Sequence, residues 1–221
     1  ARRSAEGINT TRLASSGRAD RMEASHGDVA RQVIVAMNIS PGMQALDLGC
    51  GTGWATRLLG KAAPGATAVG IDFSASMIQR AEEMHDLTSR ARYVLGSVDK
   101  IEFKDGRFDR VFTMEALPYV EDLSAVLTEA CRVTKPGGEI HLVIGRYKEC
   151  APSEGWAETI DLPMAWLSEE EWSAEISAAG FNDVTSVRVR DSHGPGEENA
   201  FAPDDYTPNW SMHLAIHEAG F

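Results

Sequence analysis

Cysteine is scarce in this sequence, and its placement excludes the usual cysteine-based sites. The three cysteines, Cys50, Cys131 and Cys150, form no C-x-x-C pair. The six histidines show no metal-ligand spacing either, so we expect no metal site. Isolated cysteines are typical of reducing compartments, and we therefore expect free thiols and a cytoplasmic location.

Basic side chains and long apolar segments are also in short supply. The chain has 21 Lys and Arg against 33 Asp and Glu, which gives a net charge of −12. A nucleic-acid-binding protein needs a basic surface, so we expect no nucleic acid partner unless the chain has a local basic patch. No apolar run approaches the length that spans a bilayer, and no signal peptide is visible. We therefore expect no membrane contact.

What the sequence does have is a regular alternation of apolar and amphipathic segments. The length of 221 residues and the hydrophobic content of 43% suit one large domain with a sizeable core. The alternation predicts an α/β fold, in which a doubly wound parallel sheet is covered by helices on both faces. We expect strands at 44–48, 67–72, 91–95, 108–114, 139–145, 184–190 and 212–217. We expect helices at 20–38, 56–63, 75–86, 122–133 and 169–179, and a turn at 135–138.

The most informative stretch is Leu46-Asp47-Leu48-Gly49-Cys50-Gly51-Thr52-Gly53. A short apolar strand leads into a glycine-rich turn, and a helix begins just after it. Such a helix N-terminus offers unpaired N–H groups and a partial positive charge to a ligand. The dinucleotide fingerprint G-x-G-x-x-G requires Gly or Ala where this chain has Trp54, so a nicotinamide oxidoreductase is disfavoured.

The same eight residues resemble motif I of the class I S-adenosylmethionine (SAM) dependent methyltransferases. Segments 108–112 and 132–138 are similar to later motifs of this family, in the same order. The resemblance covers about 29–146 and implies a Rossmann-like, seven-stranded, mostly parallel sheet with an antiparallel last strand at its edge. It also implies methyl transfer from SAM to a small-molecule acceptor, with S-adenosylhomocysteine as the product. We therefore interpret 1–221 as one domain, with an N-terminal arm (1–28), a SAM-binding core (29–146) and a substrate-side cap (147–221).

The resemblance assigns a set of residues to SAM. Asp72 ends the second strand about twenty residues after the turn, where a carboxylate can accept hydrogen bonds from ribose hydroxyls; the alternative is a helix cap. Ser97 is a departure, because relatives often have an acid there to accept from the adenine amino group, and Asp99 is a possible substitute. The residues expected around SAM are Asp47, Gly49, Cys50, Gly51, Thr52 and Gly53 at the methionine part, Asp72 at the ribose, Phe73, Met77, Ser97 and Val98 at the adenine, and Met114.

The acceptor side is less sharply defined. Glu115 follows the fourth strand and is a candidate to orient or deprotonate the acceptor, with a solvated loop acid as the alternative. Tyr119 is a second catalytic candidate, with packing as its alternative. The candidate substrate contacts include Tyr147 and Arg146, which is either a carboxylate clamp or, slightly favoured, part of a surface salt bridge. Trp156, Trp166 and Trp172 would either form an aromatic cap over the substrate or cover the sheet edge. His26 and His193 are candidate bases.

Two other functions remain open from the sequence. One is a SAM-fold protein without transferase activity, such as a sensor or a scaffold. The other is a methyltransferase for RNA or protein, which the net charge of −12 disfavours. The oligomeric state is open between a monomer and a homodimer.

Overall fold

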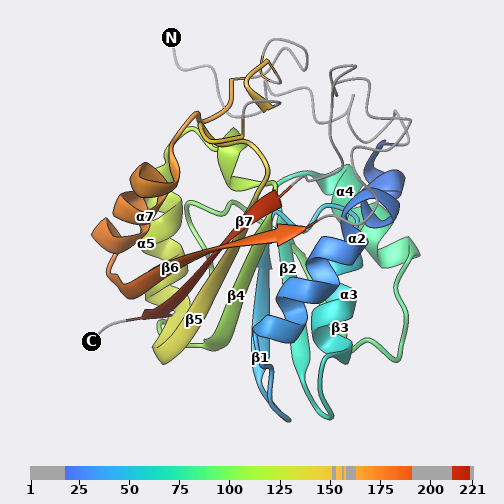
Figure 1. The fold of residues 1–221 in the computed structure, drawn as a ribbon. Helices are drawn as coiled ribbons and strands as arrows, with labels where there is room; N and C mark the ends of the chain where they lie inside the picture. The colour runs from blue at the N-terminus through green and yellow to red at the C-terminus, as the bar shows by residue number, and fades with distance from the viewer. Residues whose placement is uncertain (1–17, 151–152, 156, 158–162, 191–210, 220–221) are drawn as a thin grey trace, which may run out of the picture.

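The computed structural model describes residues 18–150, 153–155, 157, 163–190 and 211–219. Its helices and strands alternate along the chain and build a sheet with helices on both faces (Figure 1). The elements are α2 (Arg18–Ala36), β1 (Gln44–Leu48), α3 (Trp54–Lys61), β2 (Thr67–Asp72), α4 (Ala75–Glu83), β3 (Ala91–Leu95), β4 (Phe108–Met114), η2 (Leu117–Tyr119), α5 (Leu123–Val133), β5 (Thr134–Ile144), α7 (Glu169–Ala178), β6 (Phe181–Arg190) and β7 (Ser211–Ala219). The expected α/β fold with a parallel sheet between helical layers is confirmed.

The strand order across the sheet is β3-β2-β1-β4-β5-β7-β6. The pairs from β3 to β5 are all parallel, whereas β7 runs antiparallel to both β5 and β6. The closing pair of strands thus lies at one edge of the sheet, with β6 outermost. The carboxyl ends of β1, β2, β3 and β4 therefore share one rim of the sheet, where ligands bind in open α/β folds.

Side-chain alternation along the strands builds a separate core on each face. Leu46 and Leu48 of β1 pack in the cluster that contains the apolar faces of α5 and α7. Ala45, which precedes Leu46 in the same strand, packs in the cluster formed with α2 and α3. This period of two, with helices over both faces, explains why the central strands are buried throughout.

Two local expectations need correction. The segment 135–138, expected as a turn, is the first part of β5, and a register shift between Phe108 and Arg110 accommodates it beside β4. In addition, the helix expected at 20–38 runs from Arg18 to Ala36 as α2, and its Met22 packs against the core.

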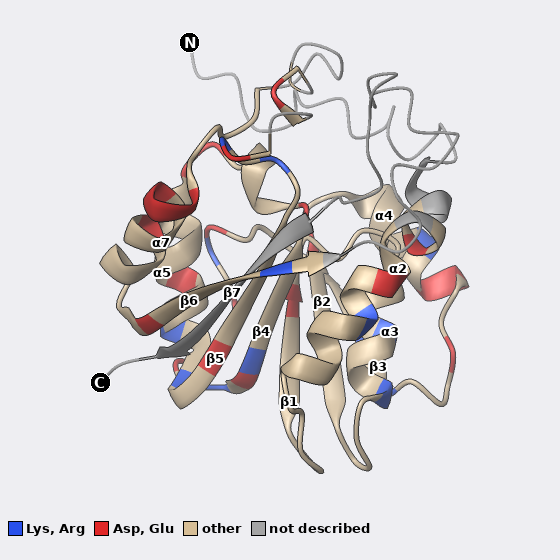
Figure 2. Ribbon diagram, viewed as in Figure 1, with Lys and Arg blue, Asp and Glu red and all other residues tan. Residues whose placement is uncertain are grey.

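The surface charge is uneven. Three glutamates, at 169, 170 and 171, fill the first turn of α7, and acidic positions cover that helix in Figure 2. Acidic side chains at a helix N-terminus interact favourably with the helix dipole. Within the described residues, no helix is both long and apolar enough to cross a membrane.

Candidate cofactor and acceptor site

The glycine turn after β1 is anchored to the neighbouring strand. The N–H groups of Gly49 and Cys50 both donate to the Ile71 carbonyl oxygen, at 2.9 and 3.0 Å. Gly49 has a φ of +71° and Gly53 a φ of +72°, and only glycine adopts such angles without strain. A Cβ added at Gly49 would lie 2.4 Å from the Ala116 Cβ. The turn is therefore fixed in shape and packs directly against the loop that follows β4.

Asp72, at the end of β2, is held by the main chain. Its Oδ2 accepts from the Gly51 N–H and its Oδ1 accepts from the Ser74 N–H, each at 2.9 Å. The carboxylate is buried, which raises its pKa, and the two hydrogen bonds partly offset that rise. The cap of α4 is Ser74, whose Oγ accepts from the Met77 N–H. The capping alternative for Asp72 is thus taken by another residue, and each of its oxygens keeps lone-pair capacity for a ligand hydroxyl.

Asp47 lies beneath the turn rather than in it. It is 2% exposed, and the Thr56 hydroxyl donates to its Oδ2 at 2.6 Å. Burial, together with the nearby charge of Asp72, raises its pKa to about 7. The same surroundings raise the pKa of Cys50 well above its usual value, so this thiol is not a nucleophile. Both residues support the turn from below.

The residues expected at the adenine lie at the ends of β2 and β3. Phe73 is 48% exposed and Met77 is partly buried, so Phe73 has an open face for a ring. Val98 packs partly against the core. The hydroxyl of the exposed Ser97 donates a hydrogen bond to the Asp99 carboxylate. Asp99 therefore supplies a carboxylate beside the position where relatives have an acid and this chain has Ser97.

Glu115 follows β4 directly and has an unusual backbone. Its φ of +55° is in the left-handed region that non-glycine residues rarely adopt. The Gly145 N–H bonds to its carboxylate, whereas its Oε1 is buried with no hydrogen-bond partner among the described residues. Burial raises the pKa of this carboxyl to about 8. A strained and partly unsatisfied acid of this kind is typical of functional sites.

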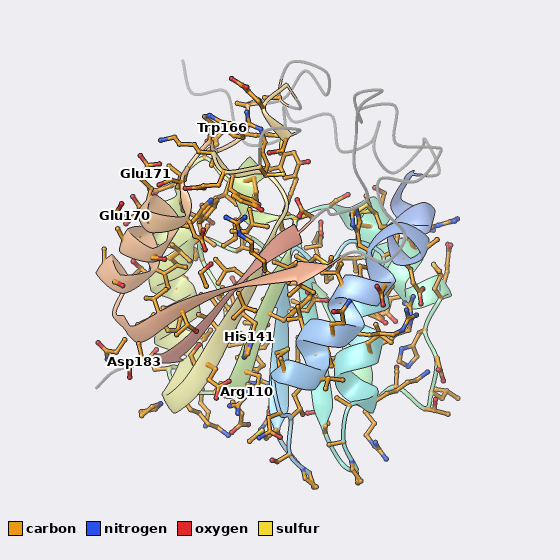
Figure 3. The ribbon with its side chains drawn as sticks, in the orientation of Figure 1. Arg110, His141, Trp166, Glu170, Glu171 and Asp183 are labelled. Atoms are coloured by element: carbon orange, nitrogen blue, oxygen red, sulfur yellow. The ribbon has the colours of Figure 1, made fainter. Side chains whose placement is uncertain are left out.

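The arrangement of Arg146 argues against the expected carboxylate clamp. Its side chain is buried, and its guanidinium donates to the carbonyl oxygens of Met164 and Ala165, at 3.1 and 2.7 Å. The guanidinium carbon also lies 4.5 Å from the centre of the Trp166 ring, a cation–π contact. Arg146 therefore fastens the segment at 163–166, including Trp166 near the upper end of the molecule in Figure 3, to the end of β5.

Other acceptor-side candidates are placed differently from expectation. Tyr147 is 2% exposed and Trp172 is 5% exposed, and both pack in the core, so neither forms an open cap. Tyr119 is partly buried at the end of η2. His26 is partly buried in α2. Trp156 and His193 lie outside the described residues.

Comparisons with known proteins agree with this geometry. Residues 46–142 match the model of a family described as a methyltransferase domain. A putative methyltransferase, solved in complex with the Trm112 methyltransferase activator of Haloferax volcanii, has 28% identity and a TM-score of 0.85, with 96% of this chain and 98% of that chain covered. Residues 46–142 are thus a methyltransferase domain.

Curated relatives of this methyltransferase domain are longer proteins. An uncharacterised 37.1 kDa protein of transposon TN4556 from Streptomyces fradiae is 36% identical over 157 residues, which cover 70% of this chain and 40% of that protein. A demethylmenaquinone methyltransferase from Bacillus licheniformis is 37% identical over 105 residues, covering 47% of this chain and 45% of that protein. The chain spans less than half the length of these two relatives.

The structure of the methyltransferase domain also brings in residues that sequence reasoning missed. Arg57, on the buried side of α3, donates to the Thr52 carbonyl oxygen at 3.0 Å and to the Tyr93 hydroxyl at 3.4 Å. A Cβ at Gly53 would lie 2.3 Å from the Tyr93 ring. The signal in the sequence is an arginine in the first turn of the helix after motif I. Once buried there, its charge requires hydrogen-bond partners, and it finds them in the glycine turn and in Tyr93.

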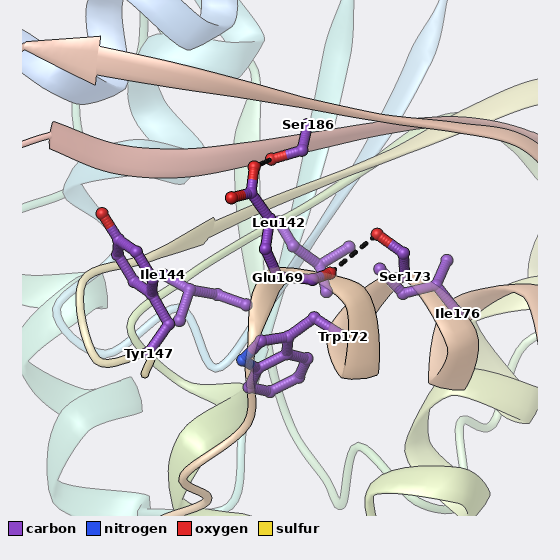
Figure 4. A pocket seen from close by; sticks show the side chains of 8 residues that line it. All are labelled: Leu142, Ile144, Tyr147, Glu169, Trp172, Ser173, Ile176 and Ser186. Carbon is purple, nitrogen blue, oxygen red and sulfur yellow. Dashed lines mark hydrogen bonds between the residues drawn. The ribbon is translucent and has the colours of Figure 1, made fainter. Parts of the chain in front are cut away.

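A small cavity of roughly 20 Å³ lies away from this turn, between α7 and the sheet (Figure 4). Its walls include Leu142, Ile144 and Trp172, and the Ser186 hydroxyl donates to Glu169 at its rim. Space of this size holds about one water molecule, so it is too small for a methyl acceptor. The described residues contain no group of three or more potential metal ligands.

Proposed function

We propose that this chain transfers a methyl group from SAM to a small-molecule acceptor in the cytoplasm, leaving S-adenosylhomocysteine. The observation that supports it best is Asp72, whose oxygens are each held by one main-chain N–H and keep room for a ribose hydroxyl. The fixed glycine turn beside it offers a close approach to the methionine part. The three cysteines are free, in keeping with a reducing compartment.

The residues present fit SAM in their chemistry. Gly49 to Gly53 would hold the methionine part, Phe73 and Met77 the adenine faces, and Val98 with the Ser97–Asp99 pair the adenine edge. Met114 and Glu115 would lie toward the methyl group, with Tyr119 a helical turn further on. When bound, SAM supplies an activated methyl group for in-line displacement, and the chain's own task is to align the acceptor and exclude water.

The test is calorimetric titration with S-adenosylhomocysteine. We expect micromolar binding by the wild type and at least about tenfold weaker binding by Asp72→Asn, because hydrogen bonds to a charged acceptor contribute about 1.5–3 kcal/mol each. Glu102→Gln, at an exposed position, is the matched control and should bind as the wild type does. Absence of binding by the wild type in the micromolar range would refute the proposal.

A transferase is distinguished from a SAM-binding sensor or scaffold by product formation. Incubation with SAM and a broad acceptor panel should yield S-adenosylhomocysteine above the level of hydrolysis. Binding without any product would favour the sensor. Labelled methyl groups on RNA or protein would instead favour a macromolecular substrate.

A protein activator is a second element of the proposal. The similar methyltransferase of known structure was solved with its activator Trm112, and the similarity extends over nearly the whole of both chains. We expect this chain to co-elute in size-exclusion chromatography with a Trm112-type protein. Elution as separate species at micromolar concentrations would exclude this partner.

The seven-stranded form of the sheet belongs to the proposal as well. In it, β7 is a stable antiparallel strand between β5 and β6. Amide hydrogen exchange should then be slow in 211–219, as in the central strand β5. Exchange at the rate of an unfolded chain in 211–219 would show that β5 is the last stable strand.

A further inference from the structure

The Glu115 carboxyl is built into the rim of the sheet beside the motif I turn. The Glu115 N–H donates to the Val143 carbonyl oxygen at 3.0 Å, which fixes the residue to β5. The next residue, Ala116, is the one that a side chain at Gly49 would strike. Glu115 thus directly precedes a residue that packs on the turn, which faces the methionine part in the proposed function.

No described basic side chain neutralises this acid. Arg146, which follows Gly145, donates to carbonyl oxygens of Met164, Ala165 and Glu154 and stacks on Trp166. The titratable group that Glu115 influences is the Cys150 thiol, whose pKa the carboxylate helps to raise. A cysteine side chain is neutral or negative, so it does not neutralise Glu115. Its support within the described residues is the Gly145 N–H, which bonds to the carboxylate.

The charged group on the other side of the turn, Asp72, has the same sign as the Glu115 carboxylate. Asp72 is buried there beside Asp47, which burial keeps protonated up to about pH 7, and the described basic residue beside the turn, Arg57, donates to Thr52 and Tyr93. An anionic acceptor would be repelled by this charge, and among the described residues beside the turn the one cation, Arg57, is already engaged. A buried carboxylate without a counter-charge is instead stabilised by a cation.

We propose, building on the methyltransferase function above, that the acceptor is a primary or secondary amine that binds as an ammonium ion to Oε1 of Glu115. Glu115 takes the ammonium proton and frees the nitrogen lone pair. The nitrogen then forms a bond to the methyl carbon as the carbon–sulfur bond breaks, and that electron pair stays on sulfur. The product leaves as the methylated ammonium ion, and Glu115 then releases its proton to solvent and returns to the carboxylate.

The experiment compares wild type, Glu115→Gln and the control Glu121→Gln, an exposed acid in the same connection. Each protein is titrated with S-adenosylhomocysteine, and benzylamine is then titrated into the complex. Turnover with SAM is measured on benzylamine, N-methylbenzylamine, benzyl alcohol, phenol and benzoate. We expect wild-type turnover with the two amines and little or none with the oxygen acceptors.

In Glu115→Gln we expect unchanged S-adenosylhomocysteine binding, at least about tenfold weaker benzylamine binding, and about a 10²-fold or larger loss of amine turnover, the usual contribution of a general base. The wild-type rate on amines should fall as pH drops below the Glu115 pKa of about 8, where the carboxyl is protonated, and this dependence should vanish in the variant. Glu121→Gln should match the wild type in every measurement.

The outcomes separate the two proposals. A wild type that fails to bind S-adenosylhomocysteine refutes the methyltransferase function itself. Binding without amine product, product on phenol or benzoate instead, or full amine turnover by Glu115→Gln overturns the amine assignment alone.

Discussion

The two aspartates near the glycine turn have the same chemistry but opposite orientations. Asp72 accepts from main-chain N–H groups and is the proposed ribose contact, whereas Asp47 accepts from a threonine hydroxyl and is enclosed. Their different surroundings give them different tasks, because burial without ionic partners favours the neutral acid. Asp47 is therefore a supporting residue, and the folded state stabilises its protonated form.

The pH dependence of stability follows from this. The pKa of Asp47 rises from 3.8 to about 7 on folding, so the folded state holds a proton that the unfolded state has lost between these values. The free energy of unfolding should therefore fall as pH rises through this range. The loss is a few kcal/mol at most, because a tenfold difference in proton affinity between the two states corresponds to about 1.4 kcal/mol. Asp47→Asn, neutral throughout, lacks this loss.

The measurement is the difference in thermal midpoint between Asp47→Asn and wild type, without ligand, at pH 5 and pH 8. We expect the difference to shift in favour of the variant at pH 8. Asp99→Asn, on the exposed loop after β3, controls for loss of a surface charge. A difference that stays constant with pH would contradict the assignment of the proton to Asp47.

At the scale of the element, α7 shows how a local sequence defines a helix. The Ser168 hydroxyl accepts from the Glu171 N–H at 3.1 Å, and the Glu171 carboxylate accepts from the Ser168 N–H at 2.7 Å. This reciprocal capping box satisfies two main-chain donors at the helix start. The buried residues Trp172 and Ile176 then lie one turn apart on the face toward the sheet.

Ser168→Ala should destabilise the protein by about 1 kcal/mol, the usual cost of a lost N-cap. Urea unfolding should show a lower midpoint with an unchanged slope. Ser177→Ala, an exposed position in the same helix, removes a hydroxyl without removing the cap and should have little effect. Equal midpoints for Ser168→Ala and wild type would show that the capping box contributes nothing to stability.

The sequence predicts features that depend on residues close together in the chain, and it fails for features that depend on residues far apart. Strand β2 and the start of helix α7 at Glu169 depend on neighbours within a few residues, and the sequence predicts both correctly. The position of β7 between β5 and β6 depends on pairing across more than sixty residues, which periodicity does not encode. The role of Arg146 depends on carbonyls up to 19 residues away, so its burial does not follow from its place after a strand.

At the scale of the whole molecule, charge limits the partners. The net charge of −12 opposes the phosphate backbone, because affinity for nucleic acid comes mainly from basic contacts. We expect a labelled RNA oligonucleotide to show no retention by this protein at micromolar concentrations in about 50 mM salt. Retention that weakens steeply between about 50 and 200 mM salt would reveal a basic patch and would favour an RNA substrate.

The contacts that hold Asp72 have an evolutionary consequence. Both donors are main-chain groups, at Gly51 and Ser74, so the contacts use no side chain except that of Asp72 itself. In the proposed function, mutations elsewhere on the surface can therefore change which acceptor is chosen without disturbing the proposed ribose position. A domain of this construction can diversify its substrates by drift in the regions around the rim while keeping one cofactor.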